Sequence, residues 1–400
     1  MQNRPTDSNF AVLAFDHPVK TVENIGNSIS NGLRTLGYKA ETLIIPRQLS
    51  ELAKMIANGI EGILSLGPLP LGLRLRNEFL HRSLQCPIWL YFLDSPIYDM
   101  LRVPITKDFL SDALTDKRLV PISPEAGYLR LLNLASLQGF WPSQTRILPF
   151  GCFPDLRPRN AGKKRKSSIC VIGTIGGELG GGKIGDDLDS IIEKLKPPTI
   201  DSHRVSSLKD ELLSNRSPAM PLEAILNNFN WKPEDWSSME NLSFACGIDS
   251  WVKRHRRLGA VRNLKGFPVD FYGGGWREAL GDIPMFRYMG NVDHNDIAHL
   301  VAQYSAVLNF DPNWSDGLHD RVYTACSMGV SVITNENSAL ANSGLPHDLI
   351  FTYDINRPNI ADIADSILSQ NYGPSTPRPD VIANHGWPAR LADFVCASLA

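Results

Sequence analysis

The chain has 400 residues, which is too long for one ordinary hydrophobic core and fits two domains of roughly 150–250 residues each. Hydrophobic residues make up 43% and charged residues 20%, which excludes a disordered or fibrous protein. The formal net charge of -2 gives no global argument for nucleic acid or an acidic membrane surface as a partner. No apolar run reaches the ~18–20 residues of a membrane span.

The cysteines and the N-terminus bear on the compartment. The N-terminal sequence MQNRPTDSNF lacks the apolar core of a signal peptide. The six cysteines are scattered and form no CxxC pair: Cys86, Cys152, Cys170, Cys246, Cys326 and Cys396. We interpret them as reduced thiols, and we expect a cytoplasmic protein.

The first 150 residues alternate strand and helix patterns. Apolar runs typical of buried parallel strands occur at 9–16, 40–46, 62–66, 87–94, 119–123 and 145–151. Helical spacing predicts helices over about 22–36, 49–58, 71–84 and 124–138. Repeated βα units joined by short links indicate a doubly wound parallel sheet, which we assign to a first domain over residues 1–156.

A polar, basic segment at 157–167 is the predicted linker. Its KKRK run could be a nucleic-acid or targeting patch, but we interpret it as a solvated connector. The strand at 168–174 then leads into the Gly-rich stretch IGGELGGGKIGDD. Its spacing fits neither GxGxxG nor GxxxxGK[ST], so a phosphate-binding loop and a surface loop are equally open.

The second half repeats the alternation after a helical insertion at about 184–262. Strands are predicted at 269–273, 287–290, 306–310, 330–335 and 349–353, and helices near 294–303, 319–328 and 358–369. The second domain spans 168–375, and 376–400 forms a C-terminal helix that could return to the first domain. The predicted fold is α/β, with two Rossmann-like doubly wound domains facing across a cleft.

In open parallel sheets, ligands bind beyond the carboxyl ends of the strands. In the first domain this rule selects Asp16 and His17 after the first strand and Asp94 after the fourth. Each is a candidate catalytic base, and each could equally be a helix cap or an internal hydrogen-bonding group.

In the second domain the same rule selects two glycine turns and an asparagine. Gly274 and Gly275 leave the backbone bare for a ligand, although a tight turn before Trp276 is the alternative. The turn Gly290-Asn291-Val292 can present backbone amides and carbonyls to a flat base. Asn335 ends another strand and is a further candidate contact.

A charged cluster stands where the helix near 319 begins. It contains Asp316, His319, Asp320 and Arg321. A helix start carries unpaired N–H groups and a partial positive charge, so this cluster can seat a diphosphate. The carboxylates could cap the helix or hold sugar hydroxyls, and Lys253 or Arg254 on the preceding helix could assist. The alternative is a set of surface ion pairs.

These motifs resemble the C-terminal domain of GT-B glycosyltransferases, most closely the CgeB-like (spore-maturation-protein-like) group. The resemblance covers about 250–370 and is weaker at 90–96 and 148–158. It rests on Phe271-Tyr272-Gly273-Gly274-Gly275-Trp276, Gly290-Asn291-Val292, a strand ending near Asn309, the run from His319 to Gly329, and Val332-Ile333-Thr334-Asn335.

The resemblance implies a nucleotide-diphosphate-sugar donor, with no cofactor and no metal. Arg321 and the amides near His319 would hold the diphosphate, Gly290 to Val292 the base, and Gly274 and Gly275 the phosphate or ribose. Retaining members of the wider clan carry a pair of glutamates around this helix, at positions that here hold Asp316 and Thr324. That departure leaves the ribose contact and the stereochemical outcome open.

We therefore expect a glycosyltransferase of the hexosyltransferase type, with a UDP-sugar as the first donor to test and His319 among the catalytic candidates. The alternatives are a non-catalytic sugar-nucleotide-binding protein and a sugar-nucleotide epimerase or hydrolase on the same fold. The acceptor, which could be a glycan, a protein or a small molecule, stays open.

Overall fold

The structure is a computed structural model. It describes residues 9–16, 20–75, 78–94, 98, 116–128, 146–152, 164–175, 185–214, 221–231, 235, 238–311, 314, 316–370 and 373–398. The chain divides into two compact units, of which unit 1 comprises Met1–Pro154 with Ala383–Ala400 and unit 2 comprises Asp155–Ile382. No helix among the described residues is long and apolar enough to cross a membrane.

Unit 1 contains a six-stranded sheet in the order β2-β1-β3-β6-β7-β8, and all of its strand pairs are parallel. The strands are β1 (Asn9–Phe15), β2 (Lys39–Ile45), β3 (Gly62–Leu66), β6 (Ile88–Tyr91), β7 (Leu119–Ser123) and β8 (Arg146–Ile147). The helices α1 (Thr21–Thr35) and α2 (Leu49–Ala57) follow β1 and β2. These elements confirm the predicted βα series. Most of the helix predicted at 124–138 lies outside the described residues.

The helix predicted over 71–84 is wrong. The structure has a small antiparallel pair there, β4 (Arg74–Leu75) and β5 (Glu78–Phe79), followed by the 3-10 helix η1 (Leu80–Ser83). Leucines at 71, 73 and 75 alternate with other residues, which is the period of a strand and not of a helix. The backbone N–H of Leu80 closes the pair on the carbonyl of Leu73 at 2.8 Å.

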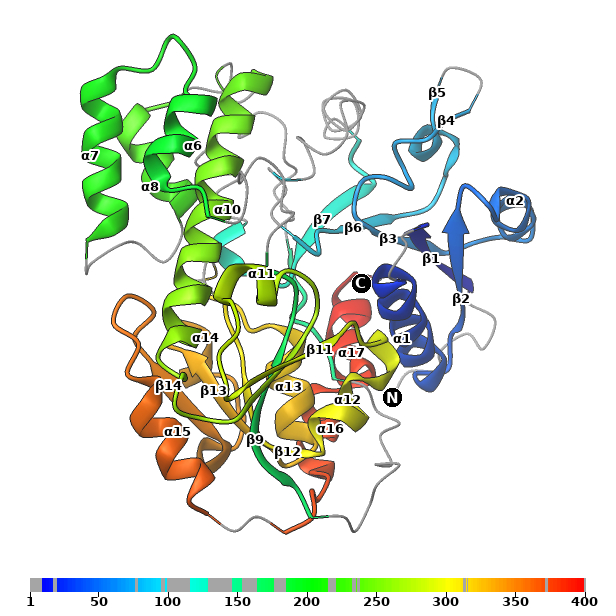
Figure 1. The fold of residues 1–400 in the computed structure, drawn as a ribbon. Coiled ribbons are helices and arrows are strands. Elements are labelled where there is room, and N and C mark those ends of the chain that lie inside the picture. Colours follow the sequence, from blue (N-terminus) through cyan, green and yellow to red (C-terminus); the bar gives the residue numbers. More distant parts are fainter. Residues whose placement is uncertain are drawn as a thin grey trace. The chain divides into compact units, whose positions relative to one another are not determined.

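The C-terminal segment forms two helices, α16 (Pro379–His385) and α17 (Trp387–Ser398), where the sequence predicts one. Helix α17 packs against α1, the red and dark blue helices that lie side by side in Figure 1. Glycines make this contact possible: a Cβ atom on Gly32 would lie 2.8 Å from Leu391 Cδ1, and one on Gly151 would lie 2.7 Å from a ring carbon of Trp387. Helix α17 is thus an integral part of the core of unit 1.

Unit 2 contains a second six-stranded sheet, and all of its pairs are parallel. The strands are β9 (Lys166–Ile172), β10 (Val269–Tyr272), β11 (Phe286–Gly290), β12 (Tyr304–Leu308), β13 (Ser331–Asn335) and β14 (Ile350–Tyr353). Their spatial order, β11-β10-β9-β12-β13-β14, is 3-2-1-4-5-6 in chain order, as in Rossmann folds. Strand order reverses between β9 and β12, where such sheets bind ligands.

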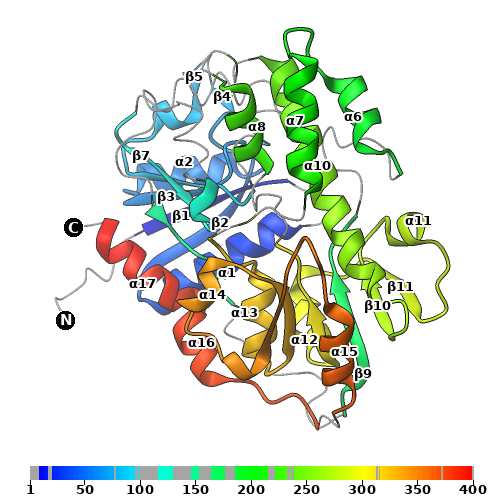
Figure 2. The ribbon, with the colours of Figure 1, turned by 90° about the vertical axis from the view of Figure 1, so that its left-hand side faces the viewer.

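Helices flank this sheet and fill the predicted insertion. They are α6 (Leu188–Leu195), α7 (Ser202–Leu213), α8 (Pro221–Phe229), α10 (Met239–Arg262), α11 (Trp276–Leu280), η3 (His294–Asp296), α12 (Ile297–Val301), α13 (Asp320–Ser327), α14 (Ser338–Ala341), η4 (His347–Leu349) and α15 (Ile360–Leu368). Figure 2 shows α10 running from the group of α6, α7 and α8 to the sheet. Its last turns supply Ala260 and Val261 to the apolar core of unit 2.

One buried polar cluster lies inside this sheet, around Asp270 on β10. Arg287 Nε donates to Asp270 Oδ1 at 2.6 Å, and the Tyr304 hydroxyl donates to Oδ2 at 2.7 Å. The Tyr304 hydroxyl also lies 2.8 Å from the hydroxyl of Tyr272. The same Tyr304 hydroxyl accepts a hydrogen bond from Lys166 Nζ at 3.1 Å. Burial and these hydrogen bonds raise the pKa of Tyr304 far above its usual range. The hydroxyl is therefore a fixed donor to Asp270.

Candidate functional site

Three strand ends meet at the carboxyl edge of the sheet of unit 2. The N–H of Gly173, after β9, donates to the carbonyl of Tyr272 at 2.9 Å, and the N–H of Gly273 donates to the carbonyl of Gly290 at 2.8 Å. Gly273 has φ +115°, and a Cβ atom there would lie 2.3 Å from the carbonyl oxygen of Gly173. Only glycine allows the chain to leave β10 this close to β9.

The glycine turn after β10 is both anchored and exposed. Trp276 Nε1 donates to the carbonyl of Gly173 at 2.6 Å. The turn therefore positions Trp276, which agrees with the alternative of a tight turn before this residue. Gly275 has φ +83° and precedes α11. Gly274 is exposed, and its carbonyl accepts from the N–H of Ile175 at 3.0 Å. The backbone at 274 is therefore rigid and open to solvent at once.

Arg321, in the first turn of α13, reaches across to the end of β9. Its Nη1 donates to the carbonyl of Ile172 at 2.6 Å, and its Nη2 lies 3.1 Å from His319 Nε2. A guanidinium has five N–H donors, and only these two acceptors engage it among the described residues. Burial lowers the pKa of Arg321, but from so high a value that the group stays charged. It can therefore still bind an anion.

His319 and Asp320 contact each other at the helix start. Nδ1 of His319 contacts the Asp320 carboxylate, and the imidazole stacks on Trp314 with ring centroids 5.6 Å apart. Burial opposes ionisation of Asp320, yet His319, together with His294 and Arg321, lowers its pKa below the usual range. The first turn of α13 therefore carries a fixed negative charge beside the guanidinium.

Asp311 and Asn335 join the ends of β12 and β13. The N–H of Asp311 donates to Asn335 Oδ1 at 2.7 Å, and Asn335 Nδ2 donates back to the carbonyl of Asp311 at 3.3 Å. Asn309 Nδ2 donates to the Asp311 carboxylate at 2.7 Å. Asp311 is buried, which raises its pKa, and its carboxylate also accepts from the backbone N–H of His319. Asn335, a predicted donor contact, thus holds two strand ends together.

The loop between β12 and α13 is tied to the end of β13. The Ser338 hydroxyl donates to the Asp316 carboxylate. Asn337 Nδ2 donates to the carbonyls of Trp314 and Gly317 at 3.2 and 2.8 Å. This bracing places Asp316 at the same edge as the His319–Arg321 turn.

Arg257 on α10 is a site residue that the sequence analysis missed. Its Nη1 donates to the carbonyl of Thr174 at 3.2 Å, next to Gly173, and its charge lowers the pKa of Arg321. Lys253, the predicted residue, lies one helical turn earlier and pairs with Asp249 at 3.9 Å. The i,i+4 spacing from Lys253 was the available signal, because it puts both cations on one helix face.

The remaining donor-side candidates differ in exposure. Gly290, with φ +80°, and Asn291 are exposed, and Val292 is half-buried, so this turn is accessible. Thr324 is only 1% exposed within α13. A ribose contact from its side chain therefore has no support in this arrangement.

The candidate catalytic bases of the first domain are Asp16, His17 and Asp94. Asp16 is exposed and forms a surface ion pair with Arg47, and Asp94 is half-buried. His17 lies outside the described residues.

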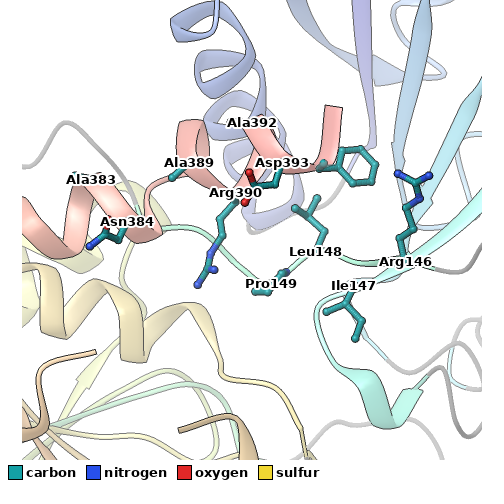
Figure 3. A pocket seen from close by; sticks show the side chains of 11 residues that line it. Arg146, Ile147, Leu148, Pro149, Ala383, Asn384, Ala389, Arg390, Ala392 and Asp393 are labelled. Atoms are coloured by element: carbon teal, nitrogen blue, oxygen red, sulfur yellow. The ribbon is translucent and has the colours of Figure 1, made fainter. Parts of the chain in front are cut away.

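A cavity of about 720 Å³ does occur in unit 1 (Figure 3). It lies between the segment 146–149 and the C-terminal helices, where Arg390 and Asp393 line it. Neither Asp16 nor Asp94 lines it, so it lends those candidates no support.

Comparison with known proteins finds a family match in the second half of the chain. Residues 254–370 match the family described as glycosyl transferase-like. The match covers less than a third of the 400 residues, so it describes a likeness of this segment. The matched segment contains Arg257, the glycine turns, Asp311 and the whole of α13, so these residues of the carboxyl-edge site lie inside it. No curated protein matches the chain.

Solved structures extend the likeness to the whole fold. Sucrose-phosphate synthase from Thermosynechococcus elongatus aligns with a TM-score of 0.50 at 12% identity, covering 98% of each chain. A glycosyltransferase from Rickettsia africae aligns with a TM-score of 0.47 at 10% identity, covering 98% of this chain and 97% of the other. The first alignment and the two parallel sheets confirm the predicted α/β GT-B architecture.

Proposed function

We propose that the chain is a glycosyltransferase of the CgeB-like type, which moves a sugar from a nucleotide-diphosphate-sugar donor to an acceptor. Glycosyl transfer requires stabilisation of a departing diphosphate. The observation that carries the proposal is Arg321, whose charged guanidinium is anchored at two points and retains N–H donors at the switch point of the sheet. Planar guanidinium groups bind phosphate oxygens in a bidentate manner.

Arg257 supplies a second positive charge to the same seat. Its side chain is fixed on Thr174, and its field acts on Arg321. Two guanidinium groups together match the two charges of a diphosphate diester. We therefore propose that no metal is needed, because these arginines supply the charge that a divalent cation would otherwise provide.

The other donor contacts follow from accessibility. The exposed Gly274 backbone would approach the ribose or a phosphate, and the Gly290–Val292 turn would contact the base. Asp316 would hold sugar hydroxyls. An inverting base would come from unit 1, with Asp16, His17 and Asp94 as candidates.

A thermal-shift panel of UDP-, GDP-, ADP- and dTDP-glucose tests the proposal, with UDP-glucose first. Wild type is expected to be stabilised by at least one of them, and Arg321→Ala to lose that shift. Arg262→Ala, an exposed arginine in the last turn of α10, is the matched control and should keep it. If Arg321→Ala binds the preferred donor as well as wild type does, the diphosphate seat is elsewhere. Hydrolysis of the bound donor with and without acceptors then distinguishes transfer from simple binding.

A further inference from the structure

Both ring nitrogens of His319 have partners. Nδ1 contacts the carboxylate of Asp320, and Nε2 lies 3.1 Å from Nη2 of Arg321. A guanidinium can only donate hydrogen bonds, so Nε2 must accept and cannot carry a proton. The proton of the ring is therefore on Nδ1, the nitrogen that contacts the Asp320 carboxylate, and the ring is neutral in this arrangement.

We propose that His319 is a positioning residue that acts through Arg321: its Nε2 accepts from the guanidinium and holds it in the orientation that binds the donor diphosphate. This inference rests on the proposed function. It differs from the catalytic role suggested by the sequence, because both nitrogens are engaged within the protein and neither is available to an acceptor hydroxyl.

The orientation of the guanidinium is set at two points. Nη1 is held by the carbonyl of Ile172 at 2.6 Å, and Nη2 by His319. The plane of the imidazole is in turn fixed by stacking on Trp314. Removing the acceptor at Nε2 leaves Arg321 with one anchor, which lets the group rotate about it. The remaining N–H donors then no longer converge on one anion.

The test compares two non-titrating replacements. His319→Gln keeps an acceptor near the Nε2 position, whereas His319→Asn keeps only a donor near Nδ1. Affinity is measured by calorimetry for whichever of UDP-, GDP-, ADP- or dTDP-glucose binds wild type most tightly.

His319→Gln should bind the donor with a Kd within about twofold of wild type, because an acceptor stays near the Nε2 position. His319→Asn should bind about tenfold more weakly, because one hydrogen bond to a charged group is lost. Equal affinities in the two variants would overturn the inference.

A second readout does not depend on donor binding. Ring ¹⁵N resonances of the free protein, with His319→Gln providing the assignment, should show the Nδ1–H tautomer at about pH 8. An Nε2–H or doubly protonated ring would overturn the inference even if donors bind. If no nucleotide sugar binds wild type at any pH, the proposed function fails, while the tautomer still decides the hydrogen-bond arrangement.

Discussion

Unit 2 contains two clusters in which a buried carboxylate meets arginine, and they differ in how completely they are closed. Around Asp270, each carboxylate oxygen has a donor, and the tyrosine and lysine partners bond to one another. Around Asp320, the carboxylate contacts His319, but the guanidinium of Arg321 donates to only two acceptors among the described residues. The first cluster lies within the sheet, and the second lies at its carboxyl edge.

The difference indicates how a buried charged cluster can be assigned to stability or to binding. A network that satisfies its own members is structural, because no donor is left for a ligand. A network with an anchored but unsaturated cation is prepared to receive an anion. Burial alone does not distinguish the two, since Asp270 and Asp320 are both buried.

The strongest test of this distinction is Asp270→Ala. Removing the carboxylate leaves the Tyr304 hydroxyl and Arg287 without their acceptor, so the free energy of unfolding should fall by about 3 kcal/mol. Urea denaturation measures the loss. Donor affinity of the folded variant should stay within about twofold of wild type. A variant of full stability that no longer binds donor would place Asp270 in the binding site instead.

The next effect in size concerns Arg257. Arg257→Ala should weaken donor binding about tenfold, because one of two cations facing the diphosphate is removed. Stability should change by less than about 1 kcal/mol. Calorimetry on Arg257→Ala and on the control Arg262→Ala measures both. Equal affinities in the two variants would remove Arg257 from the site.

Asp16→Asn extends the comparison to unit 1. Asp16 and Arg47 form an exposed pair, with side chains 55% and 60% accessible, so the free energy of unfolding should change by less than about 1 kcal/mol. Donor affinity should not change. Any loss should appear in turnover with an acceptor, which steady-state kinetics would detect. A large loss of stability would show that the pair is structural.

The smallest expected effect is that of metal removal. Because the two arginines supply the positive charge, EDTA should leave donor affinity within about twofold of its starting value. Calorimetry on protein dialysed with and without the chelator measures it. A loss that Mg²⁺ or Mn²⁺ restores would contradict the metal-free proposal.

The sequence predicts the strands and the strand-end loops well, because both depend on local patterns. Apolar runs predict the strands of the two six-stranded sheets, and each selected loop follows one of these strands. The pattern fails at 71–84, where alternating leucines outweigh a helical spacing. The sequence pattern also cannot show that the Asn335 side chain is hydrogen-bonded to Asp311. Nor can it show that Arg257, rather than Lys253, reaches the carboxyl edge of the sheet. Those facts depend on contacts between segments far apart in the chain.

The return of α17 to unit 1 has a consequence for biosynthesis. Unit 2 is one continuous stretch, Asp155–Ile382, whereas unit 1 needs Ala383–Ala400 to cover Gly32 and Gly151. Domains fold as they leave the ribosome, from the N-terminal end. In this chain the order is inverted: the unit whose synthesis begins first is completed last. Until Trp387 emerges, the surface of α1 that it covers stays exposed to chaperones and to other chains.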